Sequence, residues 1–327
     1  MVSCGLVAPV VAVSASSTDP LAIILLGPTA SGKTALALAL ASRFPAEIVS
    51  CDSVAVYRGL DIGSAKPTAA ERALVPHHLL DVTDPDRDFT AGDYARQART
   101  AMHSIVARGA TPIITGGTGL YLRALVQGLF PGPQRDDDLR RRMSRSRERR
   151  GSGWLHRLLA RLDPVTAARI HANDTPKLMR AIEVTLTARR PISDQLAEGR
   201  DALTGFRLLR IGLDPARAAL YARINDRAAQ MFAKGILAET QSLLTRFGPV
   251  RPLEALGYRQ ALAVLRAELS EPDAIAVAQQ GHRNYAKRQM TWFRREEDVH
   301  WIRQFGDTAT ALDAALALVR EHRGLLA

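Results

Sequence analysis

Cysteines and long apolar runs are scarce in this sequence, and each scarcity excludes a class of protein. Only two cysteines, Cys4 and Cys51, occur among 327 residues, and they form no CxxC pair. A disulfide framework and a cysteine-based zinc site are therefore excluded, and a reducing, cytoplasmic location is expected. No apolar run reaches the roughly 18 residues of a membrane-spanning helix, so no membrane association is expected.

Acidic residues are also in deficit. The chain carries 44 Lys and Arg against 33 Asp and Glu, which gives a net charge of +11. Such an excess favours a polyanionic partner, most simply a nucleic acid, although a solvated arginine-rich surface has the same composition. Residues 1–20 are mildly apolar and rich in serine without a basic start. We expect them to form a disordered tail rather than a signal peptide.

Apolar runs alternate with helical patterns in the first third of the chain. Residues 21–26, 46–51 and 111–115 are typical of buried parallel strands, and 34–43 and 90–108 are typical of helices. Further strands are expected at 206–213 and 299–303. This order predicts an α/β fold whose parallel sheet is flanked by helices. The string GPTASGKT after the first strand makes this a P-loop NTPase-like core.

The middle of the chain has a different pattern. Residues 123–200 contain helical segments but no convincing buried strand, and 139–150 is rich in arginine. Asn173 to Pro176 provide an N-cap and first-turn signal for a helix. We therefore predict an all-helical insertion over 123–200, within a core formed by residues 21–122 and 201–327.

The string GPTASGKT matches the pattern GxxxxGK[ST] and lies between a predicted strand and a predicted helix. In such a loop, backbone N–H groups and the lysine hold phosphate oxygens, and the hydroxyl of Thr34 can reach a magnesium ion. The pattern does not distinguish a nucleotide from a pyrophosphate. The predicted phosphate-binding residues are Gly27, Pro28, Thr29, Ala30, Ser31, Gly32, Lys33 and Thr34.

Asp52 directly follows the predicted strand 46–51, at the edge where open α/β sheets bind ligands. The strand at 111–115 ends instead in threonine and glycines, without the carboxylate that holds magnesium in many P-loop ATPases. Asp52 is therefore open to two interpretations, a magnesium ligand or a general base beside the phosphate site.

Eight strings in fixed order resemble one family. GPTASGKT is followed by the S-x-DS-x-x-x-Y pattern at 50–57, DIGSAKP, PHHLLDVTDP and GGTGLY, and then by R-I-x-x-R at 223–227, GYRQ and AKRQMTWFR. From about residue 21 to 303, the chain resembles the tRNA dimethylallyltransferases, also called tRNA isopentenyltransferases.

The resemblance implies transfer of a dimethylallyl group from dimethylallyl pyrophosphate to N6 of the adenosine at tRNA position 37. This adenosine lies 3′ of the anticodon in tRNAs that read codons beginning with U. The implied partners are the tRNA anticodon stem-loop and dimethylallyl pyrophosphate, with magnesium as cofactor, and we expect a monomer. By the same resemblance, Asp52 is the general base, Thr118 lies near the reacting groups, and Arg223 helps to neutralise the pyrophosphate.

The resemblance also implies a set of residues that contact tRNA. Many family members carry glutamine three residues after the aspartate, but this chain has Ala55, which cannot hydrogen-bond a base edge. The contact there is lost or is supplied by another residue. The implied tRNA-binding residues are Asp52, Ser53, Val54, Ala55, Thr118, Arg140, Pro176, Lys177, Leu178, Met179, Arg180, Gly257, Tyr258, Arg259, Lys287, Arg288 and Gln289.

Three other functions share parts of this pattern. An adenylate isopentenyltransferase would use the same loop and aspartate but act on AMP, ADP or ATP. A P-loop kinase or ATPase would transfer phosphoryl groups and would require a separate magnesium-binding carboxylate. A non-catalytic RNA-binding protein with a relict P-loop would tolerate loss of Asp52. The helical insertion, the GYRQ and KRQ segments and the basic charge favour the enzyme acting on tRNA.

Overall fold

The computed structural model describes residues 18–130, 132–133, 135–197 and 199–323. Most of the predicted tail, residues 1–17, lies outside this part. The chain divides into a larger unit, formed by Ala15–Leu125 and Thr204–Ala327, and a helical unit, Val126–Leu203. The limits of the helical unit differ by three residues at each end from the predicted insertion. Among the described residues, no helix has both the length and the apolar character that crossing a membrane requires.

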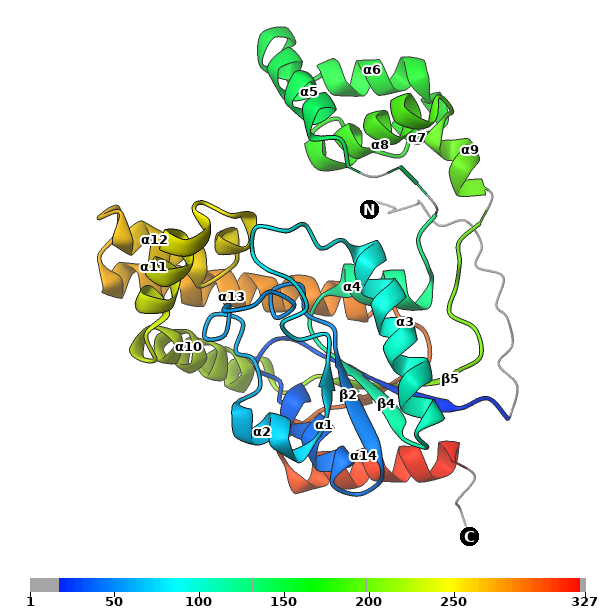
Figure 1. Ribbon diagram of the computed structural model, residues 1–327, viewed down its shortest axis with the longest axis vertical. Helices are drawn as coiled ribbons and strands as arrows, with labels where there is room; N and C mark the ends of the chain where they lie inside the picture. Colours follow the sequence, from blue (N-terminus) through cyan, green and yellow to red (C-terminus); the bar gives the residue numbers. More distant parts are fainter. Residues whose placement is uncertain (1–17, 131, 134, 198, 324–327) are drawn as a thin grey trace. The chain divides into compact units, whose positions relative to one another are not determined.

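A parallel sheet forms the centre of the larger unit, as predicted (Figure 1). In the described residues its strand order is β3-β2-β4-β1-β5-β6, and every pair is parallel. Strand β3 was not predicted, because its two residues are too short for any hydrophobic pattern. The strands are β1 (Leu21–Leu26), β2 (Ala46–Ser50), β3 (His77–His78), β4 (Thr111–Thr115), β5 (Arg207–Leu213) and β6 (Val299–Ile302).

Helices cover both faces of this sheet. Helices α1 (Lys33–Ala41) and α14 (Ala309–His322) pack on one face, where alternate strand residues such as Ile23 and Ile211 are buried. Ile24 and Ile114 point to the other face, toward α4 (Gly119–Val126) and the end of α13 (Glu271–Phe293). Helix α3 (Ala91–Ala107) joins this layer by stacking Tyr94 on Tyr121 of α4, with ring centroids 4.4 Å apart. The short α2 (Ala69–Leu74) precedes β3.

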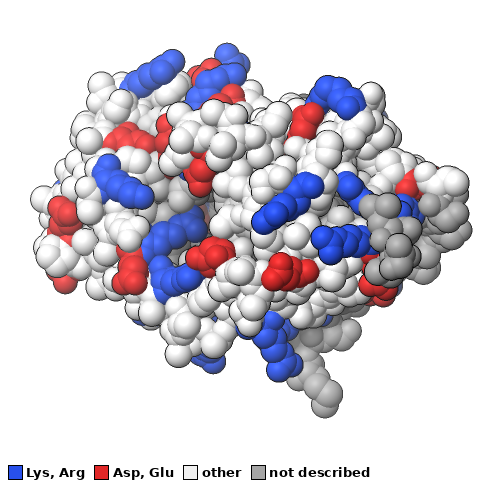
Figure 2. Space-filling view, turned by 90° about the horizontal axis from the view of Figure 1, so that it is seen from below, with Lys and Arg blue, Asp and Glu red and all other residues white. Residues whose placement is uncertain are grey.

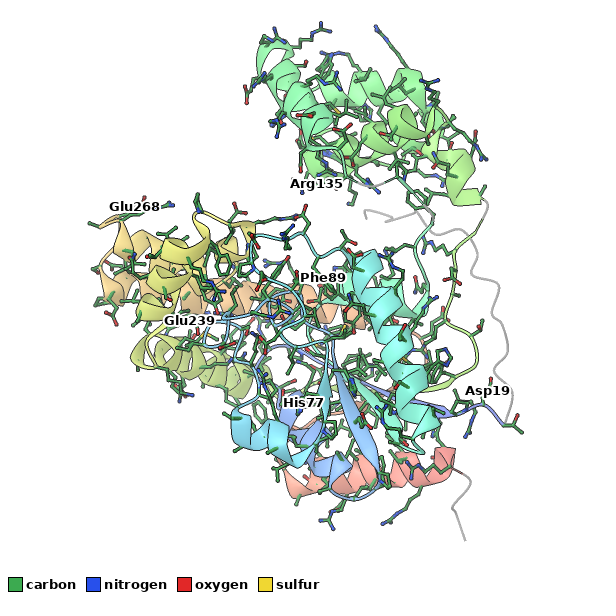
Figure 3. The ribbon with its side chains drawn as sticks, viewed as in Figure 1. Asp19, His77, Phe89, Arg135, Glu239 and Glu268 are labelled. Atoms are coloured by element: carbon green, nitrogen blue, oxygen red, sulfur yellow. The ribbon has the colours of Figure 1, made fainter. Side chains whose placement is uncertain are left out.

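A helical group after β5 has its own hydrophobic core. It comprises α10 (Arg217–Ala233), α11 (Ile236–Phe247), a 3-10 turn at Arg251–Glu254, α12 (Tyr258–Leu265) and α13. Leu60, from the loop after β2, is buried in this core beside Met231, Phe232 and Tyr258. Glu239 of α11, labelled in Figure 3, accepts hydrogen bonds from the backbone N–H of Ile62, at 3.0 Å, and from the hydroxyl of Tyr258. The group thereby fixes the loop that follows β2.

The helical unit contains no strand among its described residues. Its helices are α5 (Asp137–Arg150), α6 (Trp154–Leu162), α7 (Pro164–Ala167), α8 (Thr175–Ala188) and α9 (Ile192–Ala197). Asp174 caps α8 and Pro176 lies in its first turn, as the sequence predicted. Leu155, Leu159 and Ile182 form part of a separate core. This unit therefore buries its own apolar residues.

Candidate active site

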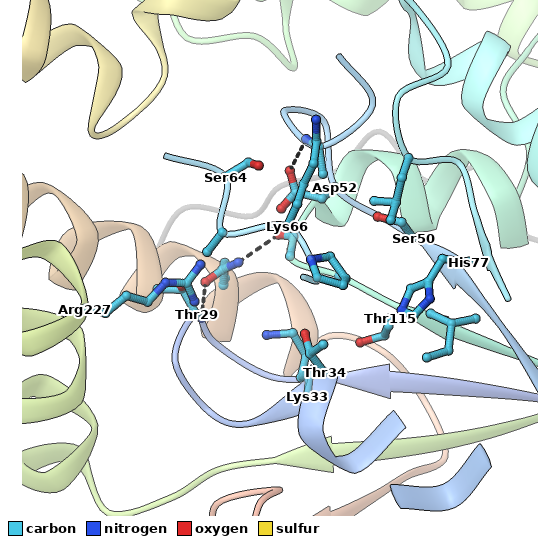
Figure 4. A pocket seen from close by; sticks show the side chains of 18 of the residues that line it. Thr29, Lys33, Thr34, Ser50, Asp52, Ser64, Lys66, His77, Thr115 and Arg227 are labelled. Carbon is cyan, nitrogen blue, oxygen red and sulfur yellow. Dashed lines mark hydrogen bonds between the residues drawn. The ribbon is translucent and has the colours of Figure 1, made fainter. Parts of the chain in front are cut away.

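A cavity opens at the carboxyl ends of β1, β2 and β4, where parallel sheets bind ligands (Figure 4). It brings together the P-loop, Asp52, the loop after β4 and one face each of α10 and α13. Its walls include Thr29, Lys33, Thr34, Ile48, Ser50, Asp52, Ala55, Lys66, Pro67, His77, Leu80, Thr115, Gly117, Arg227, Tyr285 and Gln289.

The P-loop requires glycine at two positions. Gly27 and Gly32 have φ angles of 144° and 91°, in the region that side chains rarely adopt. A Cβ on Gly32 would lie 2.7 Å from the backbone nitrogen of Gly306. That nitrogen donates a hydrogen bond of 2.9 Å to the Ser31 carbonyl. The segment before α14 therefore supports the phosphate-binding loop from behind.

Lys33 turns back over its own loop. Its ammonium donates hydrogen bonds to the carbonyls of Gly27, at 2.8 Å, and Pro28, at 2.7 Å. Burial, with a smaller repulsion from Arg227, lowers the pKa of Lys33 to about 7. A bound anion would favour the charged form and raise this pKa again. We therefore expect the Lys33 side chain to take up a proton when an anion binds in the cavity.

Two arginines on α10 have different environments. Arg227 lines the cavity, and its Nε is buried without a hydrogen-bond partner among the described residues. Arg223, one turn earlier, instead pairs with the Asp307 carboxylate at 2.9 Å, and its guanidinium lies 3.7 Å from the ring centroid of Phe305. Arg223 is not among the residues that line the cavity. Sequence reasoning overlooked Arg227, although the i, i+4 spacing of R-I-x-x-R was the available signal.

Asp52 lies in the turn after β2 and reaches the cavity wall. Its Oδ1 accepts hydrogen bonds from the backbone N–H groups of Val54, at 2.8 Å, and Ala55, at 3.2 Å. This turn holds the carboxylate in place, and no described side chain of opposite charge forms an ion pair with it. The neighbouring Cys51 is buried, and burial raises its thiol pKa to about 12, so it serves as a packing residue.

Thr118 is held beside this turn. Its backbone N–H donates to the Cys51 carbonyl at 3.1 Å, and its hydroxyl accepts from the Ser53 N–H at 3.0 Å. A Cβ on Gly116 would lie 2.1 Å from that Cys51 carbonyl oxygen, so only glycine permits the approach. The structure therefore brings the predicted residues Asp52, Ser53 and Thr118 together.

Gln289 connects the P-loop to the loop after β4. Its Oε1 accepts the Thr29 N–H at 2.8 Å, and its Nε2 donates to the Gly117 carbonyl at 3.0 Å. The Tyr285 hydroxyl donates to the same carbonyl at 3.1 Å. Because Gln289 is only 4% exposed, its side chain does not lie on the surface that the prediction of a tRNA contact implied.

Lys66, from the DIGSAKP string, fixes another wall of the cavity. Its ammonium donates to the Tyr57 carbonyl at 2.6 Å and to the carboxylates of Asp61, at 2.7 Å, and Asp81, at 2.5 Å. The Lys66 side chain is almost fully buried. Its donors are therefore occupied by protein acceptors, and the loop over Ser64–Pro67 is held against the cavity.

The oxygen ligands in this cavity suit a magnesium ion. Thr34, Ser50, Asp52 and Thr115 contribute hydroxyl or carboxylate oxygens to its wall. In the part of the chain that the structure describes, no group of three or more His, Cys, Asp or Glu could hold a metal. Magnesium commonly keeps several waters and binds through few carboxylates plus substrate phosphates. The donor set therefore fits magnesium that arrives with a pyrophosphate, and the Thr34 hydroxyl is the P-loop group that would hold it.

The other predicted tRNA contacts of the larger unit differ in exposure. Arg259, Lys287 and Arg288 are exposed, whereas Tyr258 is buried and its hydroxyl donates to Glu239 at 2.6 Å. Gly257, with φ 90°, precedes Tyr258 and is buried. Only the three basic side chains are therefore available to RNA. On the face seen in Figure 2, basic and acidic residues are interspersed, so that face shows no uniform basic patch.

In the helical unit, the buried carboxylate of Glu183 pairs with two arginines that were predicted to contact tRNA, Arg140 and Arg180. Glu183 is fully buried and pairs with Arg140 at 2.8 Å and Arg180 at 2.7 Å. Burial would raise the Glu183 pKa, but hydrogen bonds from both arginines outweigh it and lower the pKa to about 2. Leu178 is buried in the core of this unit, whereas Pro176 and Lys177 are exposed. A groove in this unit is lined by Arg135, Asp137, Arg140, Arg141, Ser144, Arg145 and Met179.

Comparison with known proteins places this geometry in context. Residues 55–296 match the family model described as IPP transferase. The chain is 58% identical to the tRNA dimethylallyltransferase of Koribacter versatilis over 304 residues, which cover 93% of this chain and 99% of that protein.

Solved structures agree with this similarity. The full-length tRNA isopentenylpyrophosphate transferase of Bacillus halodurans is 34% identical, with a TM-score of 0.68 over 93% of this chain and 98% of that one. A eukaryotic dimethylallyltransferase acting on tRNA is 24% identical, with a TM-score of 0.77 over 94% of this chain and 79% of that one. The second likeness shows the fold alone, and it confirms the predicted α/β class.

Proposed function

Because the chain belongs to the tRNA dimethylallyltransferase family and has its activity, we propose that it alkylates N6 of the adenosine at tRNA position 37. The donor is dimethylallyl pyrophosphate, and the tRNAs are those that read codons beginning with U. One observation supports this proposal most directly. A single cavity holds a phosphate-binding loop with Lys33 and Arg227 on one side and the Asp52 carboxylate on another.

The pyrophosphate half of the site neutralises the leaving group. Lys33, Arg227 and the N–H groups of the P-loop are directed at the negative charge that grows as the allylic C–O bond breaks. Arg227 is better placed for this role than Arg223, because Asp307 already pairs with Arg223 outside the cavity. A magnesium ion, when bound at Thr34, supplies further positive charge to the pyrophosphate oxygens.

The acceptor half removes a proton. The exocyclic amine of adenine is a weak nucleophile. A base that takes a proton from this amine while it attacks C1 of the dimethylallyl group therefore favours the transfer. Asp52 has this role, and Thr118, bonded to the Ser53 N–H, positions the turn that carries it. Ala55, Ile48 and Leu80 provide an apolar wall suited to a five-carbon chain.

The target adenosine must leave its stack to enter this cavity, as in other enzymes that modify bases. Exposed cations on each unit can hold the tRNA phosphates while it does so. In the larger unit these are Arg259, Lys287 and Arg288. In the helical unit, Lys177 and the arginine-lined groove with Met179 have this role. Ala55 adds no hydrogen bond to the base and belongs to the apolar wall.

Labelled dimethylallyl pyrophosphate tests the proposal. The protein is incubated with the labelled donor and magnesium, with unmodified tRNA or AMP as acceptor, while ATP hydrolysis is followed separately. Label is expected on the adenosine beside the anticodon, with none on AMP. Label on AMP alone would indicate an adenylate isopentenyltransferase. ATP consumption without labelled product would indicate that the P-loop serves an ATPase.

A further inference from the structure

We propose that Gln289 is a positioning residue that sets the separation between the pyrophosphate-binding loop and the acceptor loop. This inference rests on the proposed function, because it assigns the two loops to the two substrates. Gln289 is the side chain that bonds both, through Thr29 at 2.8 Å and Gly117 at 3.0 Å. The oxygen of the Gln289 amide therefore binds the loop proposed for pyrophosphate, and its nitrogen binds the loop proposed for the acceptor.

The two loops leave adjacent strands, because β1 pairs with β4 as far as Leu25 and Thr115. Thr29 belongs to the turn between β1 and α1, and Gly117 lies between β4 and α4. Beyond these strand ends, no backbone hydrogen bond joins the two loops in the described part of the chain, whereas α13 is a 23-residue helix. Gln289 extends from this helix and is 4% exposed, so water does not compete for its bonds. The helix thus acts as the common support for both loops.

The packing around the amide leaves little freedom. A Cβ on Gly117 would lie 2.2 Å from Nε2 of Gln289, so only glycine allows the amide to approach. Tyr285, one turn earlier on α13, donates to the same Gly117 carbonyl at 3.1 Å. The next residue, Thr118, holds the turn that carries Asp52 through the Ser53 N–H. A displacement of Gly117 therefore moves the proposed base.

This arrangement explains why the Thr29 N–H is not free for a phosphate oxygen. Backbone N–H groups of a P-loop commonly bind the anion, but here Gln289 occupies the one on Thr29. The bond fixes the loop rather than the ligand. A misplacement of about 1 Å between reacting groups can lower a rate by about a hundredfold. We therefore expect Gln289 to affect the transfer step more than the binding of either substrate.

The ratio of two products, dimethylallyl alcohol and alkylated tRNA, distinguishes a positioning role of Gln289 from a role in protein stability. When the allylic C–O bond breaks, pyrophosphate leaves with the electron pair, and C1 bonds either to N6 of adenine or to water. Attack by water, followed by loss of a proton, gives dimethylallyl alcohol. A protein with misaligned loops still promotes departure of pyrophosphate but delivers the acceptor poorly. The ratio of alcohol to alkylated tRNA therefore reports alignment, whereas simple unfolding lowers both products together.

The first test uses Gln289→Met, which keeps the length of the side chain and removes both hydrogen bonds. In single-turnover reactions with labelled dimethylallyl pyrophosphate, we expect transfer to tRNA to fall by about a hundredfold. The alcohol-to-tRNA ratio should rise at least tenfold, and the affinities for inorganic pyrophosphate and tRNA should stay within threefold. Gln280→Met is the matched control, because Gln280 is exposed on the same helix.

Gln289→Glu separates the two contacts and covers the case in which Gln289→Met does not fold. The carboxylate still accepts the Thr29 N–H but repels the Gly117 carbonyl unless it is protonated. The alcohol-to-tRNA ratio of this variant is compared with that of the wild type at the same pH. The two ratios should converge as the pH falls toward 5. Tyr285→Phe should raise the ratio less than Gln289→Met does.

Two results would overturn the inference. One is a folded Gln289→Met protein whose alcohol-to-tRNA ratio equals that of the wild type. The other is a set of variants in which both products fall by the same factor, so that the total yield changes and the ratio does not. Failure of the proposed function looks different, because the wild-type protein would then place no label on tRNA at all. The wild-type reaction in the same series therefore separates the two failures.

Discussion

Two sites, one in each unit of this protein, treat buried charge in opposite ways. At the cavity of the larger unit, Arg227 and Lys33 form no ion pair with a described residue, and burial lowers the pKa of both, although Asp52 lies in the same cavity. In the helical unit, Arg140 and Arg180 are neutralised by the buried Glu183. Unpaired buried cations are costly unless an anion arrives, so the first pattern indicates a ligand site and the second a structural centre. The net charge of +11 alone did not distinguish these roles.

The largest expected effect concerns the carboxylate of the larger unit. Asp52→Asn should lower transfer to tRNA by about 10²- to 10⁴-fold, because a general base is lost. The tRNA affinity should change little, and a single-turnover assay with a separate binding measurement checks both. Asp86→Asn is the control, since Asp86 is exposed. A fully active Asp52→Asn protein would remove Asp52 from this role.

The paired and unpaired arginines of α10 provide the next comparison. Arg227→Gln should lower kcat/KM for dimethylallyl pyrophosphate by about 10²- to 10³-fold, as when a donor to developing charge is removed. Arg223→Gln should lower it by less than about tenfold, because Asp307 already pairs with Arg223 outside the cavity. Steady-state kinetics on both variants decide the point. Equal losses, or a larger loss for Arg223→Gln, would contradict the assignment.

Glu183 tests the structural pattern of the helical unit. Glu183→Gln leaves Arg140 and Arg180 without their counter-charge and should destabilise this unit by up to about 3 kcal/mol, the lower end for a broken buried pair, because both arginines are partly exposed. The wild-type pKa of about 2 lies below the ordinary glutamate pKa of 4.5, so this stabilisation is present above pH 4.5 and is lost as the pH falls from 4.5 to 2. Hydrogen exchange of residues 137–188 measures both effects. A variant with wild-type exchange rates would show that the pair contributes little.

Lys33 provides a pH-dependent test of the cavity. Because its pKa is about 7, the Lys33 side chain is largely a neutral amine at pH 8. A bound anion favours the protonated, charged form. Binding of inorganic pyrophosphate at pH 8 should therefore take up close to one proton. Calorimetry in buffers of different ionisation enthalpy measures this uptake. Lys33→Met should remove it, and an unchanged uptake in that variant would place the proton elsewhere.

The smallest effect is expected at the surface. Arg259→Ala should weaken tRNA binding moderately and lower the slope of log affinity against log salt by about one, because one phosphate contact is lost. Transfer at saturating tRNA should be nearly unchanged. Binding measured at several salt concentrations checks the slope. An affinity equal to that of the wild type at every concentration would remove Arg259 from the tRNA surface.

Much of the fold followed from local pattern. Residues 21–26 and 111–115 were predicted as strands and are β1 and β4 with the same bounds. Residues 90–108 were predicted as a helix, and α3 begins after Thr90, which forms a capping box with Asp93. These features depend on the order of neighbouring residues alone, so sequence reasoning could find them. Strand β3 has only two residues, and it exists because β2 offers an open edge.

The site was less predictable, because its members come from distant segments. Asp52, Thr118 and the P-loop were expected together and do lie together. The choice of Arg227 over Arg223 depends on Asp307, which is 84 residues away from Arg223. The burial of Gln289 likewise depends on loops that begin 260 and 172 residues before it.

The sequence by itself determined the α/β class, the phosphate-binding loop and the family, because these depend on spacing within short segments. Tertiary structure decided which charges stay unpaired and which side chains are buried. Leu178, Tyr258 and Gln289 lie in predicted contact segments, yet their side chains face inward. The physical reason is that burial and hydrogen-bond partners are set by packing between segments, which no local pattern records.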